Sequence, residues 1–196
     1  MTDIYIYTIE NIYQFLGVFF SIIYVALSIR QNLYCWVALT IAAIFNIYAY
    51  YLIDLPLQVI MQFFFIGTAI YGFINWNKKN GEIKLKVTTK SLKYNATWMG
   101  TGILITLLLT LLLTFSNSNY LYSEYPFIDA LMFTFNMIPM YLTGKKIIES
   151  WIYFIVIDII SGLFYLQTGE FFFCALFFCY IGFASYGYIT WKKEIA

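Results

Sequence analysis

The sequence predicts an all-α integral membrane protein whose seven transmembrane helices form two parallel three-helix repeats joined by one helix (3+1+3). The composition, the number of long apolar stretches and an internal repeat support this fold class. Of the 196 residues, 62% are hydrophobic and only 11% are charged, whereas soluble domains average about 25% charged residues. Too few charged residues are present to cover a soluble domain, so we expect the chain to lie in a membrane.

Seven apolar stretches have the length of membrane-spanning helices, which need about 20 apolar residues each. Their expected limits are 11–29, 34–51, 57–76, 97–115, 126–143, 151–166 and 171–191. The connections at 30–33 and around Asp54 are short. We therefore expect the helices that they join to be antiparallel neighbours.

All 11 basic residues fall on one side of this predicted membrane. They follow the first, third, fifth and seventh stretches: Arg30, then Lys78, Lys79, Lys84, Lys86, Lys90 and Lys93, then Lys145 and Lys146, then Lys192 and Lys193. Because cytoplasmic loops accumulate Lys and Arg, we expect the N-terminus outside and the C-terminus in the cytoplasm. The N-terminus has no basic residue before Arg30, so it does not resemble a cleaved signal peptide.

An internal repeat relates the two halves of the chain. The segment YGFINWNKK at 71–79 matches YGYITWKKE at 186–194, an offset of 115 residues that also carries Trp36 onto Trp151 and Tyr50 onto Tyr165. The prediction is one membrane domain, 1–196, with a first repeat at 9–79, a linker and connecting helix at 80–123 and a second repeat at 124–194. Parallel repeats of this kind occur in transporters, whose substrate sites lie near the midplane between the repeats.

Asp158 is the only one of ten acidic residues expected deep in the membrane. A central Asp costs about 3 kcal/mol on insertion scales, so such residues usually face a bundle interior. Helical spacing places it on one stripe with Trp151, Phe154, Ser161 and Tyr165. The first-repeat counterpart of that stripe has Ala43 in place of the acid and carries Asn46. The alternative role for Asp158 is that of a protonated interhelical hydrogen-bond donor.

Other mid-span polar residues complete the candidate site, chiefly Gln62 and Asn136. One carboxylate, several amides and aromatic walls suit an aromatic cation. Trp36, Trp76 and Trp191 lie near the expected cytoplasmic interface and also fit an aromatic belt.

Other classes of function lack the residues that they need. The sequence has no histidine, no nucleophile or metalloprotease motif and no second deep carboxylate, so we do not expect an enzyme. The three cysteines lie in apolar stretches without a CxxC pattern, so neither a metal nor a cofactor is expected. A net charge of +1 gives no indication of nucleic acid as a partner. A ligand-binding receptor without transport stays open as an alternative.

The second half resembles the signature of the Pnu vitamin transporters. The matching residues are IESWIYFIVIDIISGLFYLQTGEFFFCALFF at 148–178 and YGYITWKKE at 186–194, while LPLQVIMQFFFIGTAIYGFINW at 55–76 is similar to the family's Gln-containing third helix. This resemblance implies a SWEET-like fold, a homotrimer in a bacterial inner membrane and facilitated diffusion, with a cytoplasmic kinase that traps the vitamin. It implies a site built from Gln62, Asn136, Trp151, Phe154 and Asp158.

Two departures from the family pattern bear on the substrate. Phe154 stands where the family has a second Trp, and Asp158 stands where Asn is common. Nicotinamide riboside and thiamine are both aromatic cations that an Asp suits, whereas neutral riboflavin gains less from it. The family resemblance favours nicotinamide riboside, with thiamine as the alternative.

Overall fold

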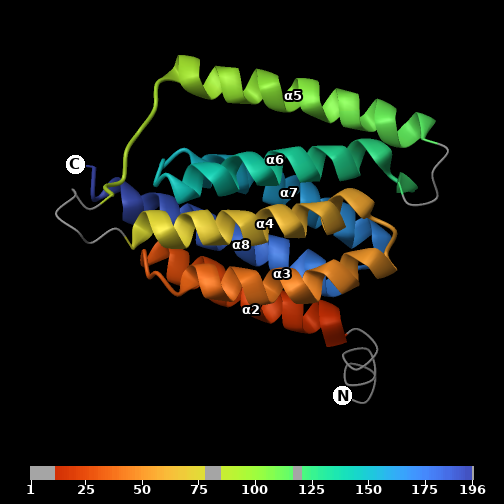
Figure 1. The fold of residues 1–196 in the computed structure, drawn as a ribbon, viewed down its shortest axis with the longest axis horizontal. Helices are drawn as coiled ribbons and strands as arrows, with labels where there is room; N and C mark the ends of the chain where they lie inside the picture. The colour runs from red at the N-terminus through yellow and green to blue at the C-terminus, as the bar shows by residue number, and fades with distance from the viewer. Residues whose placement is uncertain (1–11, 78–84, 117–120, 196) are drawn as a thin grey trace.

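The computed structural model describes residues 12–77, 85–116 and 121–195. Predictions for the N-terminal segment 1–11 and for Lys78, Lys79 and Lys84 therefore lie outside the described residues. The helices are α2 (Ile12–Ile29), α3 (Cys35–Leu52), α4 (Pro56–Trp76), α5 (Leu92–Phe115), α6 (Pro126–Gly144), α7 (Ser150–Thr168) and α8 (Phe171–Lys192), labelled in Figure 1.

Six of these seven helices are long and apolar enough to cross a membrane, which confirms the expected helical membrane protein. The exception is α6, which has similar length but carries Asp129, Asn136 and an internal Pro139. These residues lower its hydropathy and place polar groups inside the bundle. The count of seven spans stays a prediction at α6.

Six helices form a closed ring, in the order α2, α3, α4, α6, α7, α8 and back to α2. The helices joined by short connections, α2 to α3 and α3 to α4, are in contact as expected. The seventh, α5, packs on α6 and lies outside the ring (Figure 1). Two seams, α4–α6 and α2–α8, therefore join the first three helices to the last three.

The chain reverses direction in matching ways at positions 115 residues apart. Gln31 and Lys146 have φ values of 51° and 53°, and Asp54 and Gly169 have φ values of 52° and 82°. These are the only left-handed residues among those described. A left-handed residue is uncommon for any side chain other than glycine. The two residues of each pair therefore share a left-handed backbone conformation at the offset of the sequence repeat.

Local signals explain where several helices begin and end. Proline occupies the first turn of α4 and of α6, where its missing N–H has no intrahelical partner to lose. Ser91 caps α5 by accepting a hydrogen bond from the backbone N–H of Tyr94 at 3.3 Å. The left-handed Gly169 ends α7.

Four tryptophans form a continuous layer across the end of the ring at which the described lysines lie (the basic end). Their ring centroids are separated by 5.0 Å from Trp36 to Trp76, 6.3 Å from Trp76 to Trp191 and 5.3 Å from Trp191 to Trp151. Trp36 and Trp151 are 1% exposed and Trp191 is 0% exposed. The belt interpretation was therefore wrong for Trp36 and Trp191, because helix packing turns their rings inward rather than toward the lipid.

Candidate functional site

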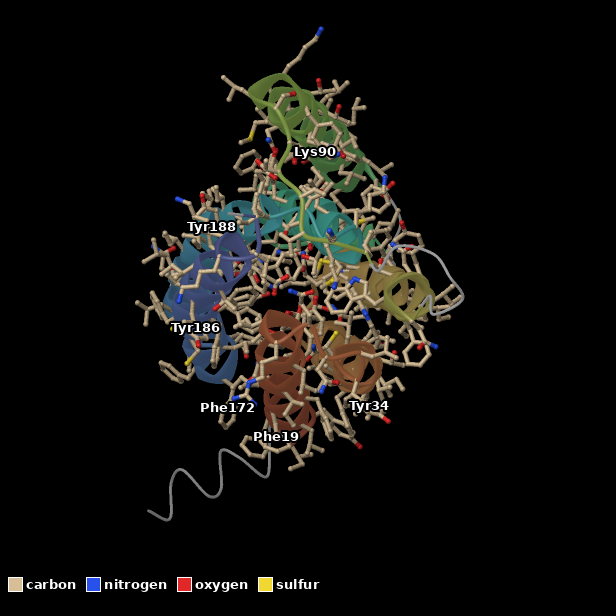
Figure 2. The ribbon with its side chains drawn as sticks, turned by 90° about the vertical axis from the view of Figure 1, so that its left-hand side faces the viewer. Phe19, Tyr34, Lys90, Phe172, Tyr186 and Tyr188 are labelled. Atoms are coloured by element: carbon tan, nitrogen blue, oxygen red, sulfur yellow. The ribbon has the colours of Figure 1, made fainter. Side chains whose placement is uncertain are left out.

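A cavity of about 70 Å³ lies inside the ring, and all six ring helices contribute to its wall. Figure 2 views the ring from its basic end and shows nitrogen and oxygen atoms gathered at the centre, while the labelled Phe19, Tyr34 and Tyr186 point outward. Known ligand pockets measure roughly 300–1,000 Å³. The cavity is therefore contracted, and a vitamin-sized ligand requires the helices or side chains around it to move apart.

Asp158 projects from α7 into this cavity. The helical period that places it beside Trp151 and Phe154 turns all three toward the centre of the ring. The carboxylate is 1% exposed, and neither of its oxygens has a hydrogen-bond partner among the described residues. The described lining includes no Lys or Arg. A charged carboxylate buried without a partner is destabilising by several kcal/mol, and a bound cation would supply the missing partner.

Amide side chains supply further acceptors around Asp158. One N–H of Gln62 donates to the backbone oxygen of Gln58 at 3.2 Å, and one N–H of Asn136 donates to that of Met132 at 2.8 Å. Each amide therefore keeps its oxygen and its second N–H for a ligand. The side-chain oxygen of Asn46 is buried without a hydrogen-bond partner in the described part of the chain. The cavity therefore presents the Asp158 carboxylate and amide oxygens as acceptors, together with donors such as the Trp151 indole N–H, which has no partner among the described residues.

Aromatic rings enclose the polar centre. Trp151 and Phe154 are in contact, with ring centroids 6.2 Å apart and planes inclined by 56°. Tyr180 of the neighbouring helix α8 and Tyr24 of α2 continue the wall. Aromatic faces attract cations and stack on planar rings. The walls therefore match the same class of ligand as the carboxylate.

The structure brings six of the eight predicted site residues to the cavity wall: Gln62, Asn136, Trp151, Phe154, Asp158 and Asn46. Ser161 and Tyr165 follow Asp158 on the same face of α7 but lie outside the lining, and both are 0% exposed. Tyr165 is stacked on Phe177 at 5.4 Å and packed on Phe173 at 5.2 Å. Aromatic side chains of α8 therefore fill the space that Tyr165 faces.

Sequence reasoning missed the contribution of α2 and α8. Ser21 and Tyr24 line the cavity from α2, and Tyr180 lines it from α8. A signal was present in α2, where Gln14, Ser21, Tyr24 and Ser28 recur at helical spacing on one face. That face is buried along its whole length. Polar residues recurring on one face of an otherwise apolar helix could have identified it as part of the interior.

Asp129 is a second fully buried acid, although the sequence placed it only at a helix end. It is 0% exposed at the start of α6. Its carboxylate accepts hydrogen bonds from the Gln58 side chain at 2.9 Å and from the Leu57 backbone N–H at 3.3 Å. Asp129 therefore joins α6 to α4 at the end of the bundle remote from the lysines. Its carboxylate has hydrogen-bond partners, whereas that of Asp158 has none in the part of the chain that the structure describes.

Comparison with known proteins gives a consistent result. A family model described as nicotinamide mononucleotide transporter matches residues 11–193. The fold is similar to the crystal structure of the vitamin B3 transporter PnuC, with a TM-score of 0.81 over 99% of this chain and 86% of that chain. The sequence identity is 15%, so that likeness shows the fold alone. No curated protein sequence matches the chain. The resemblance inferred from the sequence is confirmed at the level of the family and the fold.

Proposed function

Because the chain belongs to the nicotinamide mononucleotide transporter family, we propose that it carries a cationic aromatic vitamin across the membrane through the cavity inside the ring, nicotinamide riboside first among the candidates. The observation that carries this proposal is the buried, unpartnered carboxylate of Asp158. A phosphorylated vitamin fits less well, because the described lining offers a carboxylate and no basic side chain to a phosphate. The uncharged sugar of a riboside avoids that repulsion.

Thiamine is the second candidate, and Phe154 is the reason to keep it. Thiamine also carries a permanent charge on an aromatic ring, so Asp158 suits it equally. Phe154 replaces the Trp expected from the family pattern and lies against Trp151 in the cavity wall. The preference for nicotinamide riboside comes from a family pattern that has Trp at this position. With Phe154 in its place, this part of the wall has a different shape. Riboflavin is neutral and gains less from the carboxylate.

For the mechanism, we propose that the two three-helix units, α2–α4 and α6–α8, rock against each other around the cavity, with α5 as the connector and α6 as the seventh span. The duplicated turns and the two seams between the units support this arrangement. Each seam is tied at the basic end: Asn75 donates to the Gly144 backbone oxygen at 3.0 Å, and Trp191 donates to the Ile29 backbone oxygen at 3.2 Å. These ties and the tryptophan layer must open for a ligand to leave on that side.

We further propose facilitated diffusion in a homotrimer, with trapping of the vitamin by a cytoplasmic kinase. Transport by this mechanism needs no coupling ion, and Asp158 is the only acid in the described lining of the cavity. We expect vesicles containing the protein to exchange internal unlabelled vitamin for external labelled vitamin, with a rate unchanged when proton and sodium gradients are dissipated. If exchange were lost when either gradient is dissipated, facilitated diffusion would be excluded. Binding of the vitamin without exchange would identify a receptor.

The decisive experiment is a titration of the purified protein with nicotinamide riboside, thiamine and riboflavin, read by quenching of tryptophan fluorescence. Asp158→Asn removes the charge with little change in volume. Hydrogen bonds to charged groups contribute about 1.5–3 kcal/mol, so we expect binding of the cationic vitamin to weaken by roughly 10- to 100-fold. Glu124→Gln, an exposed acid outside the cavity, is the matched control. Equal affinity of Asp158→Asn and the parent would show that Asp158 is not the counter-ion.

A further inference from the structure

A second cavity, of about 630 Å³, lies outside the ring between α5, α6 and α7. It shares no lining residue with the central cavity. The cavity arises because α5 packs on α6 while standing away from the rest of the bundle (Figure 1). Near its basic end, the Tyr153 hydroxyl donates to the Asn95 backbone oxygen at 2.9 Å and bridges α7 to α5. The result is an elongated groove on the lipid-facing side of the molecule.

The walls of this groove are apolar and open to the bilayer. Met99 of α5 and Ile152 of α7 are each 46% exposed, and Val156 of α7 is 55% exposed. Phe135 of α6 and Ile157 of α7 form the floor. Beyond the polar residues at its basic end, the described lining offers no group that could hold a polar solute. The groove therefore fits a hydrocarbon chain rather than the vitamin.

The length of the groove matches one leaflet of a bilayer. Along α7 the lining runs from Glu149 at the basic end to Ile160, a rise of about 16 Å at 1.5 Å per residue. The hydrocarbon core of a bilayer is about 30 Å thick. The groove therefore extends from the basic interface to the midplane, which is the depth that one acyl chain occupies.

The charges at the basic end of the groove suit a lipid headgroup. Lys90 lies at the rim with its side chain exposed. The nearby acid, Glu149, is engaged through one oxygen, which accepts from the Thr89 hydroxyl at 2.5 Å and from the Lys90 backbone N–H at 2.9 Å. Lys90 is the one basic side chain in the described lining, so a phosphate at this rim meets its ammonium group beside one partly engaged carboxylate.

We propose that the groove is a binding site for one glycerophospholipid of the leaflet at the basic end, with an acyl chain between α5 and α7 and the phosphate beside Lys90. The lipid fills the space that separates α5 from the ring and holds the connecting helix at a fixed distance. This inference depends only on the protein lying in a membrane and is independent of which vitamin the protein carries.

Native mass spectrometry of the full chain, with dioleoyl phosphatidylglycerol titrated into the detergent solution, tests the site. Val156→Trp fills the groove from α7 and Met99→Trp fills it from α5. Leu163→Trp, on an exposed part of α7 outside the groove, is the matched control. We expect one tightly retained lipid per chain in the parent and the control, and at least a fivefold weaker retention in both groove variants. Equal retention in all four proteins would overturn the site.

Two further arms separate the headgroup from other occupants. We expect Lys90→Gln to weaken retention of phosphatidylglycerol while leaving that of dioleoylglycerol, which has no phosphate, unchanged; an equal effect on both would overturn the role of Lys90. The same spectra report the oligomeric state. If the groove variants dissociated an oligomer and left lipid retention intact, the groove would be a contact between copies of the chain, and the lipid site would be wrong.

Discussion

At the residue scale, two glycines allow the tryptophan layer to form. A Cβ atom built on Gly187 would lie 2.9 Å from the ring of Trp151, and one built on Gly72 would overlap the ring of Trp36. Gly72 and Gly187 are 115 residues apart, as are Trp36 and Trp151. Each helix hairpin thus places a glycine directly against its own buried tryptophan. Both rings are 1% exposed, so a methyl group added at either glycine would displace a buried ring.

We expect Gly187→Ala to destabilise the protein, because overpacking a core typically costs about 1–3 kcal/mol. Thermal unfolding in detergent measures this effect. Gly182→Ala in the same helix is the control, since no heavy atom lies within 4 Å of the place that its added methyl group would take; alanine there should be neutral or stabilising, given its higher helix propensity. A Gly187→Ala protein as stable as the Gly182→Ala protein would contradict the tight contact with Trp151.

The residues of the candidate site were only partly predictable from the sequence. Asp158 could be identified because one carboxylate in an apolar helix is a strong local signal, and helical spacing placed Trp151 and Phe154 with it. The same spacing could not show where the cavity ends. Tyr165 shares the stripe, yet its environment depends on Phe173 and Phe177 of another helix. Contacts between helices decide that boundary, and no pattern within one helix encodes them.

At the scale of elements, the hydrogen bonds of Asp129 connect α6 to α4 and stabilise their contact. The Asp129 carboxylate accepts hydrogen bonds from the Gln58 side chain and from the Leu57 backbone N–H, both in the first turn of α4. A carboxylate at a helix N-terminus also interacts favourably with the helix dipole. This buried connection fixes how the start of α6 meets the start of α4 at one seam of the ring.

We expect Asp129→Ala to lower the free energy of unfolding by about 1–3 kcal/mol, the range for a buried donor left without its acceptor. Asp129→Asn keeps one acceptor oxygen and should lie between Asp129→Ala and the parent. Unfolding in a graded detergent mixture, followed by circular dichroism, provides the measurement. The exposed neighbour Glu124, changed to Ala, serves as the reference. If Asp129→Ala were no less stable than this reference, the bond would not stabilise the seam.

The helix limits were predicted closely where hydrophobicity changes abruptly and less closely where it does not. The first stretch was expected at 11–29 and the structure has α2 at Ile12–Ile29. The fourth was expected to begin at 97, whereas α5 begins at Leu92. Its first turn contains Lys93 and Asn95, which are polar but can form a helix after the Ser91 cap. Apolar content predicts the part of a helix inside the membrane, and capping residues decide where the helix starts.

At the scale of the whole molecule, the described basic residues lie at one end of the bundle, whereas acids occur at both ends. The described basic residues lie in or beside the turns and helix ends on the left in Figure 1. Lys146 joins the two halves there, donating to the side chain of Gln31 and lying 4.9 Å from the centre of the Trp76 ring. The opposite end carries acidic residues such as Glu124 and Glu170. This placement of the basic residues is the feature that the charge rule for membrane topology uses.

We expect the basic end to face the cytoplasm, and single cysteines test this orientation. Glu124→Cys should react with a membrane-impermeant maleimide in intact cells, whereas Lys193→Cys should react only after the membrane is permeabilised. Both positions are exposed. The parent supplies the background, because Cys35 and Cys174 are buried and the exposed Cys179 lies within α8. Labelling of Lys193→Cys in intact cells would reverse the predicted topology.

The order of the helices around the ring was beyond the reach of sequence reasoning. Short connections predicted that α2 meets α3 and that α3 meets α4. The long segments around α5 left its place open, and only the structure puts it outside the ring. Likewise, no feature of α2 alone indicated that its other neighbour is α8.

That neighbour relation has a consequence for how the chain folds. Gln14 of α2 donates to Glu170, 156 residues later, at 2.7 Å, and Ile29 of α2 accepts from Trp191, 162 residues later. During synthesis α2 enters the membrane long before α8 exists, and its polar face has no partner there in the meantime. Association of these two helices must therefore be a late step of folding. A ribosome stalled before α8 would leave an inserted chain with an unpaired polar helix, which membrane quality control could recognise.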